Sequence, residues 1–137
     1  MAEITITPAD VLKTNTTSVQ EGIAGATITA GMALYIDTAA SGVLKPCDAD
    51  SVASTVCAGL ALHGAATGQP IKYATGGDLT ISSVMTVGRI YLVSQATAGS
   101  LCVDADILQG DFVSIVGVAS TATNLKININ NSGVARP

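Results

Sequence analysis

Two pairs of aspartates are the clustered carboxylates of this chain. Asp48 and Asp50 flank one alanine, and Asp104 and Asp106 repeat the same Asp-Ala-Asp pattern. Such a pair in a loop could bind Ca²⁺, which takes about six to eight oxygen ligands, but neither pair has the Gly and Glu of an EF-hand loop. Asp side chains also accept hydrogen bonds from backbone amides in turns. The sequence favours this turn role and leaves ion binding as the alternative.

The other residue types that could perform chemistry are isolated. His63 is the one histidine, and a catalytic base would need an acidic or nucleophilic partner near it. We predict a hydrogen-bonded structural role for it instead. No serine lies in a GxSxG motif, and no GxGxxG or GxxxxGK(S/T) phosphate loop occurs. We therefore predict that the protein is not an enzyme and uses no cofactor.

The three cysteines Cys47, Cys57 and Cys102 have no CxxC spacing. An odd number of cysteines without a secretory signal argues against a disulfide framework. We predict that all three are small, buried apolar side chains in a reducing compartment. Reducing agents and chelators should then leave the thermal stability unchanged.

The composition predicts a protein that is partly covered by other chains. The length of 137 residues suits one domain. Apolar residues make up 48% of the chain, aromatic residues 3% and charged residues 12%, and the mean hydropathy is +0.51. So few charges leave a large apolar share for the surface. We therefore expect a homo-oligomer.

Charge and hydropathy also bear on the partner classes. The net charge is −4, and the six basic residues are scattered along the sequence: Lys13, Lys45, Lys72, Arg89, Lys126 and Arg136. Binding to a phosphate backbone needs clustered cations. No run approaches the roughly 18 apolar residues that span a bilayer, and the first residues lack the pattern of a signal peptide. We expect no nucleic-acid partner, no membrane partner, and synthesis in the cytoplasm.

One pattern occurs twice and predicts the architecture. The matched glycines are Gly31 and Gly88, Gly42 and Gly99, and Gly59 and Gly117. The two copies cover about residues 28–61 and 85–119, and each runs as strand, glycine turn, short strand, acidic turn and strand. Two copies are too few for a solenoid. The frequent turns and the absence of a helical period predict an all-β fold, a small barrel or sandwich of short strands with this internal pseudo-repeat and minimal helix.

The segments outside the copies predict further strands. Gly76 and Gly77 separate two short alternating runs, 71–74 and 79–82, which is typical of a β-hairpin. Strict alternation over 125–130 predicts a strand that then releases a tail. Residues 3–7 also alternate and precede a polar break. We therefore predict an N-terminal strand or arm over 1–18 and a single β domain over 19–137.

Several of these segments resemble one family. The similar stretches are Ala30–Tyr35, Ala58–Leu62, the Gly68–Gly77 region and Gly110–Ala119. They resemble the small capsid cement, or head decoration, proteins of tailed bacteriophages, and the likeness covers about 25–137. It implies a β-rich virion protein, usually a trimer, that binds the major capsid protein on the outside of the icosahedral head. It carries no catalytic residues.

Two other functions are alternatives to a capsid protein, and three residues are candidates for intermolecular contacts. A phage tail or baseplate structural protein is the second hypothesis, and a β-barrel that binds a small ligand or sugar is the third. A pocket with convergent polar groups would favour the third. Ile4 and Ile6 alternate with threonines, so this segment has one apolar side that could add to a neighbour's sheet edge. The alternative is that it pairs within its own subunit as an edge strand. We name Ile4, Ile6 and Val134 as candidate contacts between subunits or with the capsid.

Overall fold

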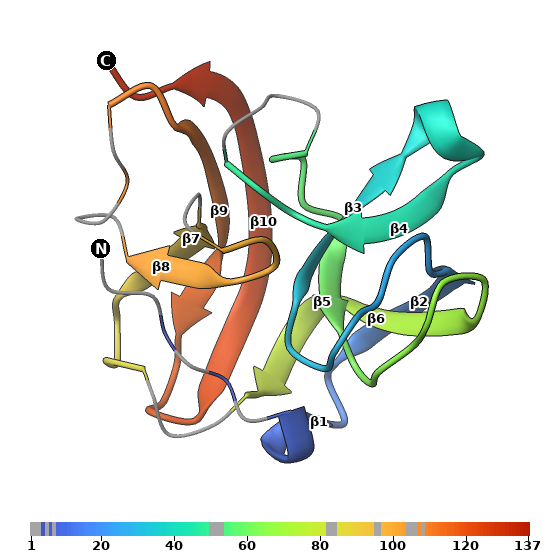
Figure 1. The fold of residues 1–137 in the computed structure, drawn as a ribbon. Helices are drawn as coiled ribbons and strands as arrows, with labels where there is room; N and C mark the ends of the chain where they lie inside the picture. The colour runs from blue at the N-terminus through green and yellow to red at the C-terminus, as the bar shows by residue number, and fades with distance from the viewer. Residues whose placement is uncertain are drawn as a thin grey trace.

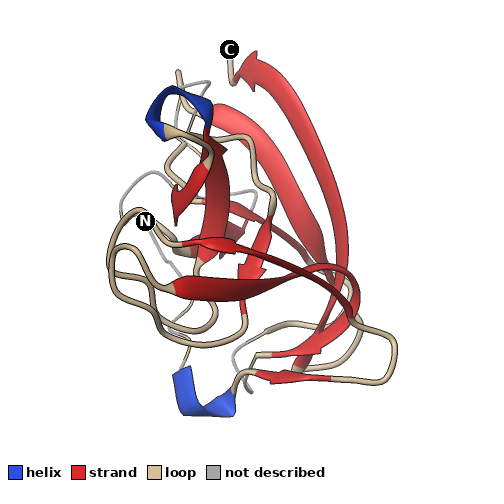
Figure 2. Ribbon diagram, turned by 90° about the vertical axis from the view of Figure 1, so that its right-hand side faces the viewer, coloured by secondary structure: helices blue, strands red, loops and turns tan. Residues whose placement is uncertain are grey.

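A computed structural model describes residues 4, 6, 8–49, 54–81, 85–94, 97–103, 107 and 109–137. The described part is almost entirely β structure and holds two short 3-10 turns but no α-helix (Figures 1 and 2). The elements are η1 Pro8–Asp10, β1 Leu12–Lys13, β2 Ser18–Ile23, β3 Ala33–Asp37, η2 Thr38–Ala40, β4 Val43–Pro46, β5 Gly59–Ala61, β6 Pro70–Thr80, β7 Ile90–Val93, β8 Leu101–Val103, β9 Phe112–Ala119 and β10 Asn124–Ala135. The prediction of an all-β fold with minimal helix is confirmed.

The pseudo-repeat in the sequence is a repeat of topology. The strand order is β4-β3-β5-β6-β10-β9-β7-β8, and neighbouring strands run antiparallel. We call β3 to β6 the first unit and β7 to β10 the second unit. In each unit a hairpin comes first, its first strand then pairs with the third strand, and the third pairs with the fourth. The fourth strands, β6 and β10, pair with each other and join the units.

Strand β6 turns the corner between the two units. Its first part, up to Gly76, pairs with β2 and β5, whereas Gly77 to Thr80 pairs with β10, and Thr80 also pairs with β1. The prediction of a hairpin at the glycine pair is therefore wrong. Gly77 has a φ of +77°, and a Cβ there would collide with the backbone oxygen of Thr16. The chain does not reverse its direction here. Instead, the glycines let one continuous strand bend where the loop at Thr16 crosses it.

The main core lies between the two units. The first unit contributes two small side chains, Ala33 and Ala74, and the larger Leu60, all with no exposed surface. The second unit contributes larger ones, among them Tyr91, Val93, Leu101, Val116 and Leu125. The small residues on one sheet and the bulky ones on the other let the two layers approach closely. The low aromatic content therefore still allows a packed interior.

Each unit has a second, smaller apolar cluster on its other face. Behind the first unit, Leu34, Leu44 and Ala61 pack under residues of the neighbouring loops, Ile28 and Ala65. Ile28 and Ala65 also form a bridge in which each amide donates to the other's carbonyl oxygen. Behind the second unit, Leu92, Cys102 and Ile107 form a third cluster.

Several predicted boundaries differ from those observed. The copy predicted over 28–61 has its first strand only from Ala33, and its closing strand is the short Gly59–Ala61. At the chain end, the expected tail continues as strand to Ala135, with register shifts in its pairing to β9. Pro8–Asp10 form a single turn inside the segment 1–18 that was predicted as a strand or arm. The residue at which a strand begins or ends depends on how far its neighbouring strand can pair with it. The local sequence pattern does not contain that information.

Candidate functional site

His63 is placed by two backbone contacts and lies at the surface. Its Nδ1 lies 2.9 Å from the carbonyl oxygen of Gly64, and its Nε2 accepts a hydrogen bond from the backbone amide of Lys72 at 3.1 Å. These contacts fix the ring as the tautomer that donates from Nδ1. The expected hydrogen-bonded structural role is confirmed. The side chain is exposed.

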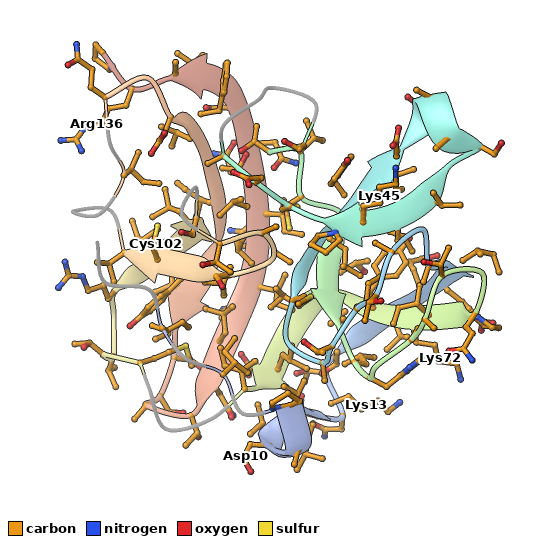
Figure 3. All side chains as sticks on the ribbon, in the orientation of Figure 1. Asp10, Lys13, Lys45, Lys72, Cys102 and Arg136 are labelled. Atoms are coloured by element: carbon orange, nitrogen blue, oxygen red, sulfur yellow. The ribbon has the colours of Figure 1, made fainter. Side chains whose placement is uncertain are left out.

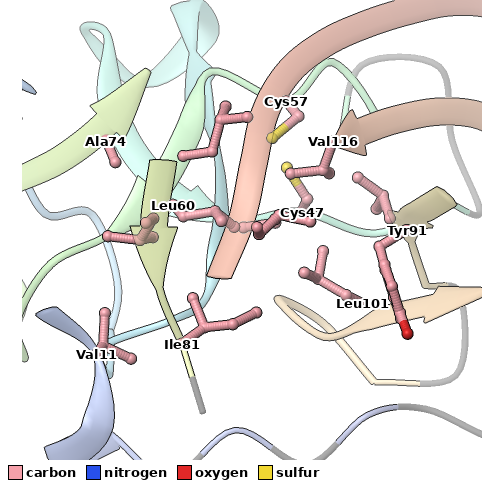
Figure 4. Packing of buried hydrophobic residues seen from close by; sticks show 14 of the residues in the cluster. Val11, Cys47, Cys57, Leu60, Ala74, Ile81, Tyr91, Leu101 and Val116 are labelled. Atoms are coloured by element: carbon pink, nitrogen blue, oxygen red, sulfur yellow. The ribbon is translucent and has the colours of Figure 1, made fainter. Parts of the chain in front are cut away.

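The three cysteines are buried, as predicted. The sulfur atoms of Cys47 and Cys57 point toward each other in the main core, beside Val116 (Figure 4). The hydrogen bond with Cys57, together with burial, raises the pKa of the Cys47 thiol far above its usual range. Because the thiolate is the reactive form, Cys47 is an inert, apolar core residue at neutral pH. Cys102 packs in the third cluster and its Sγ lies 3.9 Å from the carbonyl oxygen of Val93.

The predicted acidic pairs are only partly within the described residues. Asp48 is half-buried, and its backbone amide donates to the carbonyl oxygen of Ser54 while its own carbonyl accepts from the Ser54 hydroxyl. Asp50, Asp104 and Asp106 lie outside the described residues. Within the described part of the chain, no three His, Cys, Asp or Glu side chains gather where they could hold a metal ion.

An ion pair braces the hairpin of the first unit. Lys45 Nζ lies 2.8 Å from Asp37 Oδ2, and the Asp37 side chain also accepts from the amide of Ala39 at the start of η2. The hydrogen bond from Lys45 lowers the pKa of Asp37, and the same bond raises the pKa of Lys45. Asp37 is the register partner of Val43 and Lys45 that of Tyr35, so the ion pair runs diagonally between β3 and β4. The sequence alone does not indicate this pair, because its two residues are 8 positions apart and meet only when the hairpin forms.

The N-terminal candidates for intermolecular contact lie against their own chain. Ile4 and Ile6 are partly buried on the main core, and the amide of Ile4 donates to the carbonyl oxygen of Leu101 at 3.1 Å. Leu101 belongs to β8, the edge strand of the second unit. Val134 is 62% exposed. The predicted contacts of these residues with other subunits stay a prediction.

Exposed aliphatic side chains are the most distinctive surface feature. They are Leu12, Ile23, Ile36, Val56, Val87, Ile90, Val118 and Val134. Of the cationic groups, Lys45, Lys72 and Arg136 lie in separate regions of the molecule (Figure 3), whereas Lys13 and Lys72 line the same depression. Only Val134 of this exposed set is among the contact residues predicted from the sequence. Comparison of the two copies could have found others, because Val87 and Ile90 stand where the first copy has alanines.

Two open depressions lie on the surface. One of about 440 Å³ is lined by Lys13, Val19, Gln20, Glu21, Leu62 and Lys72. Another of about 420 Å³ is lined by the run Thr86–Ile90 of the second unit. The first has charged groups of both signs at its rim, and the second has two large aliphatic side chains. The second depression therefore favours an apolar contact over a polar small ligand.

Comparisons with protein-family models, with curated proteins and with solved structures found no match. None of the helices in the described residues is long and apolar enough to cross a membrane.

Proposed function

We propose that this protein is a capsid cement protein, which binds the outer surface of an icosahedral phage head and stabilises the shell by bridging capsomers. Its partners would be further copies of itself, most simply in a trimer, and the major capsid protein. The proposal rests first on the likeness of the glycine-and-strand segments to that family. The all-β architecture is compatible with it.

One structural observation supports the proposal most directly. Among the described residues, eight large aliphatic side chains are exposed, and six of them lie on strands, in a chain with only 12% charged residues. A rigid strand presents its side chains with little loss of conformational freedom on binding. Such a surface suits a protein that acts by contact alone.

The mechanism requires only binding energy. A copy that contacts two capsomers must be released, or must stretch, before the capsomers can separate under the pressure of the packaged genome. Each contact contributes little, but many copies on one symmetric lattice act together. The shell would then withstand a higher internal pressure without any covalent change.

The test uses heads that lack this protein. Purified protein is added to them, and the temperature at which the genome is released is measured by the fluorescence of a DNA-binding dye. We expect saturable binding in fixed proportion to capsomers and a higher release temperature. An unrelated small β protein of similar net charge serves as the control. Binding to tails in place of heads would favour a tail component, and no binding to either would contradict the proposal.

A further inference from the structure

Three exposed aliphatic residues lie together on the outer face of the second unit. Ile90 and Val118 are register partners on the adjacent strands β7 and β9, and Val87 lies just before β7. Their exposed fractions are 38%, 37% and 63%. We call these three residues the outer patch. The depression over Thr86–Ile90 includes two of them, and Lys126 of β10 borders the patch as the register partner of Val118.

The first unit has the same positions, and there they are buried. Ala33 pairs with Leu60 as Ile90 pairs with Val118, and the next positions along β3 and β7, Leu34 and Tyr91, pair with the matched glycines of β5 and β9. Ala30, Ala33 and Leu60 are 8%, 0% and 0% exposed. They belong to the main core, where the second unit packs over them.

The two units are therefore stacked face to back. The second unit covers the first with the side that carries Tyr91 and Leu101. The matching side of the first unit, with Leu34 and Leu44, is covered by Ala24, Ile28 and Ala65 of the chain's own loops. One end of the stack is thus closed by loops. At the other end the third cluster buries Leu92, but the outer patch beside it is exposed. A terminal unit in a stack needs a cap of its own or another chain over it.

We infer that the outer patch is where a second copy of this chain packs. The occupant follows from the first unit, where the equivalent surface is covered by a β layer of this same chain. Val118 and Ile90 are branched and aliphatic, which suits packing against another β layer without a demand for hydrogen bonds. Lys126 stays at the rim, where its charge remains solvated. This inference does not depend on capsid binding.

The test compares two isoleucines with similar exposure. Ile90 is in the outer patch, and Ile23, 45% exposed, is on β2 beside the first unit. We expect the wild type to associate between micromolar and submillimolar concentration in sedimentation velocity. Ile90→Asp should weaken that association at least about tenfold, because a carboxylate would be buried at the contact, and Ile23→Asp should not. Circular dichroism checks that both variants fold.

Three results would overturn the inference. One is a wild type that stays monomeric throughout, which would assign the patch to another partner or to none. The second is an Ile90→Asp variant that associates as the wild type does. The third is an equal loss of association in Ile23→Asp, which would mean that added charge acts generally and not at the patch.

A second measurement decides the matter if Ile90→Asp does not fold. Val118→Cys introduces an exposed thiol, while the three native cysteines are buried. The rate constant for labelling with a maleimide should fall several-fold as the protein concentration rises, because the second copy covers the thiol. Ile23→Cys should label at one rate at all concentrations. An equal, concentration-independent rate for Val118→Cys would overturn the inference.

Discussion

The first and second units share their strand pairing but turn opposite sides toward the main core. Gly59 and Gly117 occupy the same register position, beside Leu34 and Tyr91 respectively. Yet Leu34 faces the loops behind the first unit, whereas Tyr91 faces the main core. The reverse holds one residue earlier, where Ala33 is buried in the core and Ile90 is exposed. Matched positions in a repeat thus have different environments when the copies stack face to back.

The residue types follow this difference in packing. At the interface the first unit has the small Ala33 and Ala74, which leave room for Tyr91 and Leu125 of the second unit. At the outer face the second unit has Ile90 and Lys126 in the equivalent places. At these positions the first unit is covered by the second unit, whereas the second unit is exposed at the surface. Substitutions at matched positions should therefore change the stability by different amounts in the two units.

The bend that joins the units should be the most sensitive point. Gly77→Ala places a Cβ against the backbone oxygen of Thr16 and holds Ala at a φ of +77°. We expect a loss of about 4 kcal/mol in the free energy of unfolding, measured by urea denaturation. Gly64→Ala is the control, since its Cβ would have its nearest neighbour at 3.4 Å. Equal midpoints for the two variants would contradict the bend as described.

A matched pair at one register position separates the two units. Leu60 is fully buried and Val118 is 37% exposed. Leu60→Ala should cost about 3 kcal/mol of stability because it leaves a cavity in the main core. Val118→Ala should cost less than about 1 kcal/mol in the dilute monomer. Similar losses at both sites would show that the second unit is covered as fully as the first.

A pair of glycines tests what the units have in common. A Cβ at Gly59 would collide with the backbone oxygen of Ala74, and one at Gly117 with the backbone oxygen of Lys126. These are equivalent contacts between the third and fourth strands of each unit. Alanine at either site should destabilise by about 1 to 3 kcal/mol, because the strands must separate. Thermal melts that place the two losses far apart would weaken the equivalence of the units.

Only part of this arrangement could be predicted from the sequence. The repeated glycines at turns with positive φ, such as Gly42 and Gly99, mark the hairpins in the local sequence. The all-β fold and the repeat could therefore be predicted. The side on which each unit is covered was not, because alternation reports two faces and not their neighbours. For the same reason the bend at Gly77 was predicted as a hairpin.

The surface was harder to predict than the core. Ile90 and Val118 are apolar residues in strands, and sequence alone cannot separate an exposed one from a buried one. Their register pairing comes from strands far apart in the chain. The Asp37–Lys45 pair likewise depends on the register of one hairpin. Val134, which the sequence analysis named as a contact, is exposed, and its partner stays a prediction.

The smallest expected effect concerns the hairpin tips. Where the first unit has Asp37 and Lys45, the second has the buried Ser94 and Cys102. Asp37→Asn keeps an acceptor for the Ala39 amide but removes the charge. The wild type should be slightly more stable at neutral pH, because exposed ion pairs contribute little. Urea midpoints of the two proteins across a pH series measure this difference.

The pH dependence of that difference has a defined sign. The pKa of Asp37 is lowered in the folded state, so its contribution is present above the unfolded value of 3.8 and is lost as pH falls through the folded value. The pKa of Lys45 is raised, so its contribution is complete below 10.5 and is lost as pH rises through the folded value. A difference that persisted unchanged into strong acid would show that the substitution acts through something other than the charge.

The central claim, that the protein coats a phage head, is tested most directly by imaging. A Val134→Cys variant is labelled with small gold particles through its exposed thiol, mixed with virions whose genome encodes this chain but which lack the protein, and examined by negative-stain electron microscopy. The account predicts gold distributed over the whole outer surface of the head at regular intervals. Gold confined to the tail or to one vertex, or absent from the virion, would contradict it.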